Sequence, residues 1–128
     1  MDKIEKYIKM CKKAIKIRKE WKPCFGDLAY ELTTKSVVQI SGHAVHAFKE
    51  NPFRMADYIW LPRQDQLQEM ISKESIYLIG RFHSWFYSYP HSGGSEKPLN
   101  ATLEQLWLAF VMHEKYGKVW NEEKEGWA

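Results

Sequence analysis

Histidine and cysteine are the residues of this sequence whose chemistry would suit a metal site or a covalent reaction. His43 and His46 stand three positions apart, which on a helix would place both rings on one side for a metal ion. Helix propensity is poor around them, and on a strand an odd spacing directs the two rings to opposite faces. No nearby acid or cysteine completes a set of ligands. We therefore expect two partly exposed histidines and no metal.

The two cysteines, Cys11 and Cys24, form no CxxC pair and lack the spacing of metal ligands. In a reducing cytosol, two free thiols are favoured over a disulfide. Cys24 lies between Pro23 and Gly26 in a turn that would expose it, but no motif links it to the base that nucleophilic catalysis needs. We expect neither a disulfide nor a catalytic cysteine.

Paired acids and a pair of glycines are the other features that could carry chemistry. Glu104 and Glu114 are ten residues apart, roughly 15 Å along a helix, and His113 points away from its neighbour Glu114. Gly93-Gly94 lacks the lysine pattern and the preceding strand of a phosphate-binding loop. We therefore expect no catalytic residue and no cofactor. The sequence leaves open whether the histidines converge in the fold: His43, His46, His83, His91 and His113.

Aromatic residues are unusually frequent, with six Trp and seven Tyr in 128 residues. Tryptophan carries a large apolar area, is seldom wholly buried and is often found at interfaces. We expect most aromatic side chains to fill a core and its rim, and some of them to grip a partner. The predicted partner-binding residues are tryptophan anchors and the polar residues that flank them: Trp21, Trp60, Arg63, Gln64, Gln68, Trp85 and Trp120.

Positive charge is concentrated at the start of the chain. Residues 1–22 hold nine basic and three acidic residues (+6), which leaves ten basic and thirteen acidic (−3) in the rest. A row of lysines on an amphipathic helix suits nucleic acid or another anionic surface. More often such lysines form a solvated face whose stems cover apolar groups. The nucleic-acid alternative assigns the contacts to Lys9, Lys13 and Lys16.

The first half of the chain is predicted to hold one helix and a small sheet. Apolar spacing predicts a helix over residues 2–19, and Pro23 ends this region. A turn at 24–27 precedes a hairpin of strands 28–32 and 36–40, and a third strand at 57–60 leads to a corner at Pro62. Residues 41–48 are either a continuation of the sheet or a loop. The apolar stripe of the first helix is Ile4, Ile8, Cys11 and Ile15.

The second half is predicted to be helical. One helix begins at Pro62 or Arg63 and runs to about residue 71, and a cap or kink falls at 72–75. A helix over 76–87 precedes a loop at 89–98. The last helix begins with a capping box of Thr102 and Gln105 and stops at Gly117. The expected apolar face of the helix over 76–87 is Ile79, Phe82, His83 and Phe86.

These elements predict an α+β fold, in which a small antiparallel sheet of about three strands packs with N-terminal, middle and C-terminal helices. The length is that of one domain, residues 1–128, with 121–128 as a frayed tail unless Trp127 docks. No apolar run approaches the ~20 residues of a membrane helix. The charged start lacks the apolar core of a signal peptide. We expect a cytoplasmic protein with no membrane contact.

Four stretches of the chain are distinctive when taken together. They are Tyr7-Ile8-Lys9-Met10-Cys11, Trp21-Lys22-Pro23 with Gly26-Asp27, Trp60-Leu61-Pro62-Arg63-Gln64-Asp65-Gln66-Leu67-Gln68-Glu69-Met70, and residues 102–120. In these stretches the chain resembles a group of small uncharacterised proteins encoded by phages and prophages of Gram-positive bacteria. The resemblance implies a bacterial host cytoplasm during infection or lysogeny. It implies no activity, cofactor or catalytic residue.

The sequence therefore predicts a non-enzymatic binding protein of phage or prophage origin that acts on a host or phage macromolecule. A protein partner or self-association is expected. The alternative is a nucleic-acid-binding protein that uses the lysine-rich first helix. A small enzyme or a nucleotide-binding protein, with a pocket near Pro62, is the less favoured alternative.

Overall fold

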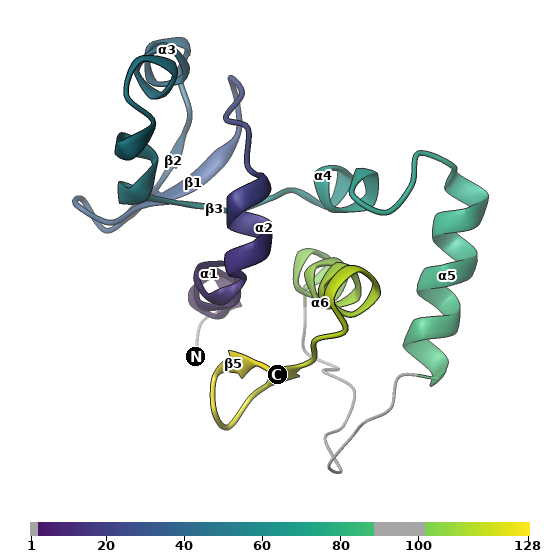
Figure 1. Ribbon diagram of the computed structural model, residues 1–128. Helices are drawn as coiled ribbons and strands as arrows, with labels where there is room; N and C mark the ends of the chain where they lie inside the picture. Colours follow the sequence, from purple (N-terminus) through teal and green to yellow (C-terminus); the bar gives the residue numbers. More distant parts are fainter. Residues whose placement is uncertain (1–2, 89–101) are drawn as a thin grey trace. The chain divides into compact units, whose positions relative to one another are not determined.

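The computed structural model describes residues 3–88 and 102–128, and Figure 1 labels its six α-helices and the strands β1, β2, β3 and β5. The chain divides into two compact units. The first, here called the sheet unit, comprises residues 1–63 and 120–128, and the second, the helical unit, comprises residues 64–119. The fold is α+β, as the sequence predicts, with a small antiparallel sheet among helices. That the two units form one domain stays a prediction.

Two helices, rather than one, occupy the start of the sheet unit. They are α1 (Lys3–Lys13) and α2 (Ile15–Glu20), separated at Ala14, whose φ of −82° and ψ of 67° are not helical. After the break, Ile17 is buried whereas Ile15 is 50% exposed, and Ile4 near the start of α1 is 60% exposed. The predicted stripe is therefore wrong at both of its ends. The buried side chains of the two helices and of the residue between them are Met10, Cys11, Ala14 and Ile17.

The sheet has the strand order β2-β1-β3 and is antiparallel throughout. Its strands are β1 (Leu28–Glu31), β2 (Ser36–Gln39) and β3 (Tyr58–Trp60). The predicted hairpin is confirmed, with Ala29 of the central strand opposite Val38 on one side and Trp60 on the other. Gly26, with φ of +90°, takes the left-handed conformation that the turn before β1 requires.

Residues 41–48, expected to be strand or loop, belong instead to helix α3 (Gly42–Glu50). Ser41 caps its start, because the Ser41 side chain accepts a hydrogen bond from Ala44 N at 3.1 Å. The helix buries Phe48, which outweighs the poor propensity of this segment. A 3₁₀ helix, η1 (Pro52–Asp57), then leads into β3.

The end of the chain also differs from prediction, because residues 120–127 are not frayed. They form a β hairpin, here called the C-terminal hairpin, of β4 (Trp120–Asn121) and β5 (Gly126–Trp127). Trp127 docks on the sheet unit, where its Nε1 donates a hydrogen bond to Met10 O at 3.0 Å. The two indoles of the hairpin pack edge to face, with ring centroids 5.1 Å apart. This docking supplies the apolar contact that an isolated hairpin lacks.

The helical unit contains α4 (Gln64–Glu69), α5 (Ser75–Ser88) and α6 (Leu103–Tyr116). The predicted capping box of α6 is confirmed, since the side chains and main-chain N–H groups of Thr102 and Gln105 bond reciprocally. Gly117 ends α6 with φ of 64°, as predicted. The predicted loop at 89–98 lies outside the described residues.

An aromatic cluster joins α5 to α6. The ring of Phe82 stacks on Trp107 with centroids 4.2 Å apart, and Trp85 and Phe110 close the cluster. Trp85 is 6% exposed whereas Ile79 is 68% exposed. The predicted apolar face of this helix is therefore wrong for Ile79 and also for His83, which is exposed, because the helix turns Trp85 toward α6.

Candidate partner-binding pocket

An open pocket of about 240 Å³ lies in the sheet unit, where α2, η1 and β3 meet. Three of its residues come from α2, one follows α2 directly, two come from η1 and two from β3. Its lining combines an apolar surface with two cationic side chains. The lining residues are Ile15, Arg18, Lys19, Trp21, Met55, Ala56, Tyr58 and Trp60.

Two stacked indoles form one part of the lining. Trp21 and Trp60 lie nearly parallel, with an interplanar angle of 7° and ring centroids 6.1 Å apart. Phe48 of α3 packs its ring against Trp21 at 6.1 Å and an angle of 62°. Each indole is only 6% exposed. The aromatic wall is thus continuous with the core of the sheet unit, which makes it rigid.

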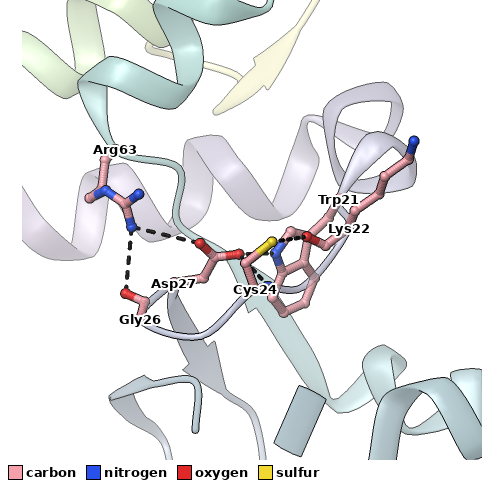
Figure 2. Close-up of polar contacts among 6 residues, drawn as sticks. All are labelled: Trp21, Lys22, Cys24, Gly26, Asp27 and Arg63. Atoms are coloured by element: carbon pink, nitrogen blue, oxygen red, sulfur yellow. Dashed lines mark hydrogen bonds and ion pairs between the residues drawn. The ribbon is translucent and has the colours of Figure 1, made fainter. Parts of the chain in front are cut away.

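Asp27 holds the indole of Trp21 in place (Figure 2). Its Oδ2 accepts hydrogen bonds from Trp21 Nε1 and from Cys24 N, both at 3.0 Å, and the residue is 2% exposed. Arg63 Nη1 lies 3.6 Å from Asp27 Oδ1 and 3.4 Å from Gly26 O. Figure 2 shows the carboxylate between the guanidinium and the indole. A buried carboxylate is retained only where it is paired in this manner.

Tyr58 is held by a second carboxylate. Its hydroxyl donates to Glu31 Oε2 at 2.7 Å, and the Thr34 hydroxyl donates to Glu31 Oε1 at 2.6 Å. These two hydrogen bonds lower the pKa of Glu31, and the bond to the carboxylate raises the pKa of Tyr58. The phenol therefore stays neutral, and its ring remains packed against Phe48 at 5.2 Å.

Three polar groups of the lining residues differ in their hydrogen-bond partners. Arg18 Nη1 donates to Lys12 O at 3.1 Å. Lys19 is exposed and makes no hydrogen bond or ion pair within residues 3–88 and 102–128. Trp60 Nε1 is buried and has no acceptor among those same residues. A buried donor without an acceptor costs about 1–3 kcal/mol.

The structure places the predicted partner-binding residues in several locations. Trp21 and Trp60 stack together in the pocket lining, and Asp27 links Trp21 to Arg63, which lies outside the lining. Trp120 stands in the C-terminal hairpin against Trp127. Trp85 is buried in the helical unit, and Gln64 and Gln68 are half-buried on α4 of that unit. Sequence reasoning missed most of the lining, although Tyr58 alternates with Trp60 along β3 and so shares its face of the strand.

The lysines of the nucleic-acid alternative are largely engaged within the chain. Lys9 Nζ lies 2.7 Å from Glu125 Oε2, and Lys13 Nζ donates to Glu125 O at 2.5 Å. The ion pair with Lys9 lowers the pKa of the Glu125 carboxyl. Lys16 is exposed on α2. The excess positive charge of the N-terminal region is therefore offset in part by the acidic C-terminal hairpin.

The histidines do not gather into a metal site in the part of the chain that the structure describes. No group of three His, Cys, Asp or Glu side chains there is placed to hold an ion. His46 Nε2 instead lies 3.0 Å from Glu50 Oε1, a partner one helical turn away. The ring of His83 packs on Tyr87 at 4.6 Å. His91 lies outside the described residues.

Both cysteines are free thiols in contrasting surroundings. Cys11 is 2% exposed, and burial raises its pKa far above the ordinary value. Cys24 is exposed, and its Sγ lies 3.4 Å from Lys22 O (Figure 2). Because the thiolate is the reactive form, burial makes Cys11 both inaccessible and hard to ionise, whereas Cys24 is open to solvent.

This contrast predicts the labelling pattern of the native protein. We expect iodoacetamide to alkylate Cys24 and to modify Cys11 at least about 100-fold more slowly, because a buried thiol is neither ionised nor accessible. Mass spectrometry of the native and the urea-unfolded chain measures the sites. The Cys24→Ser variant serves as the control and should gain almost no label while folded. Equal native rates at both cysteines would contradict the burial of Cys11.

Every helix within residues 3–88 and 102–128 is too short or too polar to span a lipid bilayer. Comparison of the chain with protein-family models, with curated proteins and with solved structures gives no match.

Proposed function

We propose that this chain is a non-enzymatic binding protein, and that it holds a protein partner by taking one large apolar side chain of that partner into the pocket of the sheet unit. The observation that carries the proposal is the pocket itself, with its two stacked indoles and its two basic residues. Stable protein interfaces commonly depend on a few anchor side chains seated in well-packed pockets.

The size of the pocket favours a side chain over a metabolite. Sites for small molecules and cofactors are commonly about 300–1,000 Å³. The pocket here measures about 240 Å³ and is open to solvent on one side. It is therefore suited to a single protruding group, with the rest of the partner lying outside.

The charge of the lining supports an acidic residue beside that apolar group. Arg18 and Lys19 both belong to α2 and both line the pocket. An apolar side chain flanked by glutamate or aspartate suits both the apolar lining and the two cations.

A defined peptide panel tests the proposal. The probes are acetylated and amidated Gly-Glu-Xaa-Glu-Gly peptides in which Xaa is Phe, Leu or Gly. Nuclear magnetic resonance of the ¹⁵N-labelled protein follows the indole N–H signals of Trp21 and Trp60. We expect the Phe and Leu peptides to shift the Trp60 signal and the Gly peptide to leave it in place. Equal shifts with all three peptides would refute an apolar pocket.

Filling the pocket should abolish this binding. We expect Ala56→Trp to weaken binding of the Phe peptide by at least about tenfold, because the new ring occupies the space that the peptide side chain needs. The matched control is Phe53→Trp, on the same 3₁₀ helix but 89% exposed and outside the lining. If the Ala56→Trp protein binds as tightly as the control, the pocket is not the site.

The wider expectations of the sequence remain predictions beside this proposal. They are a phage or prophage origin, a bacterial host cytoplasm, self-association, and nucleic-acid binding through Lys9, Lys13 and Lys16.

A further inference from the structure

A second surface of the sheet unit is already occupied by part of the same chain. Lys6, Lys9 and Lys13, here called the lysine ridge, follow one another at spacings of three and four and so share one side of α1. Lys6 pairs with Glu122, and Lys9 pairs with Glu125. Lys13 donates to the main-chain carbonyl of Glu125. Three successive cations of one helix are thus bound to one short acidic segment.

An aromatic contact adds to these charges. Trp127 Nε1 donates to Met10 O at 3.0 Å, and the same carbonyl accepts from Ala14 N at 3.1 Å. Met10 lies in the last turn of α1. A carbonyl oxygen has two lone pairs, so Met10 O accepts from both Ala14 N and the indole. The segment that binds α1 therefore carries two glutamates three residues apart, Glu122 and Glu125, and a tryptophan two residues further along, Trp127.

The C-terminal hairpin is held only lightly. Its strands are two residues each, and Glu125 adopts φ of 48°, which is uncommon outside glycine. The ion pairs are partly exposed, because the Lys9 and Glu125 side chains retain 42% and 41% of their exposure. Ion pairs of this kind are screened by salt and contribute little each. A hairpin bound in this way can exchange with another segment of the same chemistry.

We infer that the lysine ridge is a docking surface for an acidic protein segment of the pattern Glu-x-x-Glu-x-Trp, and that the C-terminal hairpin is its intramolecular occupant. The geometry favours a peptide over nucleic acid. The occupant that the structure shows is itself a peptide segment, whose carboxylates pair with Lys6 and Lys9 and whose indole N–H donates to Met10 O. Because a tethered segment acts at an effective concentration near the millimolar range, an outside segment binds well only when the hairpin is weakened.

The full-length chain tests this inference through two glutamates of the hairpin. The probe is a fluorescein-labelled peptide with the sequence of residues 119–128, and fluorescence anisotropy measures its binding. We expect Glu125→Gln to raise the affinity for the peptide about threefold to tenfold over the wild type, because the internal competitor is weaker. Glu123→Gln changes the net charge equally, yet Glu123 has no hydrogen bond or ion pair to any described residue. This control should leave the affinity unchanged.

Further variants separate the possible outcomes. Adding Lys9→Gln to Glu125→Gln should reverse the gain in peptide affinity, because Lys9 also binds the peptide. Glu122→Gln alone should raise the affinity as Glu125→Gln does, because it removes the ion pair between Lys6 and Glu122. Equal affinities of the Glu125→Gln and Glu123→Gln proteins would overturn the inference. A labelled strand of deoxythymidine that gains affinity in Glu125→Gln, while the peptide does not, would overturn it in favour of nucleic acid. None of these variants alters the pocket, so failure here leaves the proposed function standing.

Discussion

Replacing Asp27 with alanine is expected to destabilise the protein by about 3–5 kcal/mol, because two hydrogen-bond donors lose their acceptor inside the sheet unit. The donors are Trp21 Nε1, which is buried, and Cys24 N. The loss also removes the carboxylate that lies beside Arg63. Urea unfolding followed by tryptophan fluorescence measures the change.

Two variants control this experiment. Asp27→Asn keeps one acceptor oxygen and should lose roughly half as much stability, since one amide oxygen still serves the indole. Asp57→Ala removes an exposed aspartate of η1 and should change the stability by less than about 0.5 kcal/mol. If the Asp27→Ala and Asp57→Ala proteins have similar free energies of unfolding, Asp27 does not hold the Trp21 indole in place.

The second large effect is expected in the helical unit, where Phe110→Ala should cost about 3–5 kcal/mol. Phe110 is fully buried, and its ring meets Phe82, Trp85 and Trp107 at centroid distances of 5.5 Å each. Removal of the ring leaves a cavity and also ends three aromatic contacts. Differential scanning calorimetry, together with fluorescence, measures the loss.

The matched control for this variant is Ile76→Ala, which truncates a side chain on α5 that is 89% exposed. It should change the free energy of unfolding by less than about 0.5 kcal/mol. Comparison with Asp27→Ala also tests the one-domain prediction, because the two variants lie in different units. One shared transition that moves in both variants supports a single domain, whereas two transitions that move separately contradict it.

The parts of the fold that could be predicted are those with local signals. The hairpin of β1 and β2 follows from alternating apolar residues on either side of a polar turn. The limits of α6 follow from Thr102, Gln105 and Gly117, whose roles are decided within one helical turn. Each of these features depends on residues no more than a few positions apart.

The failures have a shared physical cause, because they depend on distant contacts. The helix at 42–50 has weak propensity and forms through the Ser41 cap and the burial of Phe48 against Trp21 and Tyr58. The order of residues 120–127 depends on α1, more than a hundred positions earlier. No sequence window contains both partners, so propensity and periodicity cannot register these contacts.

The pocket was predictable only in part. Trp21 and Trp60 were selected as large aromatic anchors, and they do lie together. Their faces are mostly buried, however, and the groups that remain accessible are the side chains of α2 and η1 around them. Lys19 lies on α2, which begins after the break at Ala14, and the sequence carries no glycine or proline to mark that break.

The order of the segments has a consequence for how the protein is made. The chain leaves the sheet unit after Arg63 and re-enters it at Trp120, so the whole helical unit is synthesised in between. Contacts between α1 and the C-terminal hairpin join positions 112 to 117 residues apart. During vectorial synthesis on a ribosome, α1 therefore emerges long before its covering segment exists. Until residues 120–127 have been synthesised, the lysines of α1 lack these partners and are exposed near ribosomal RNA. Closing a loop of this length also slows folding.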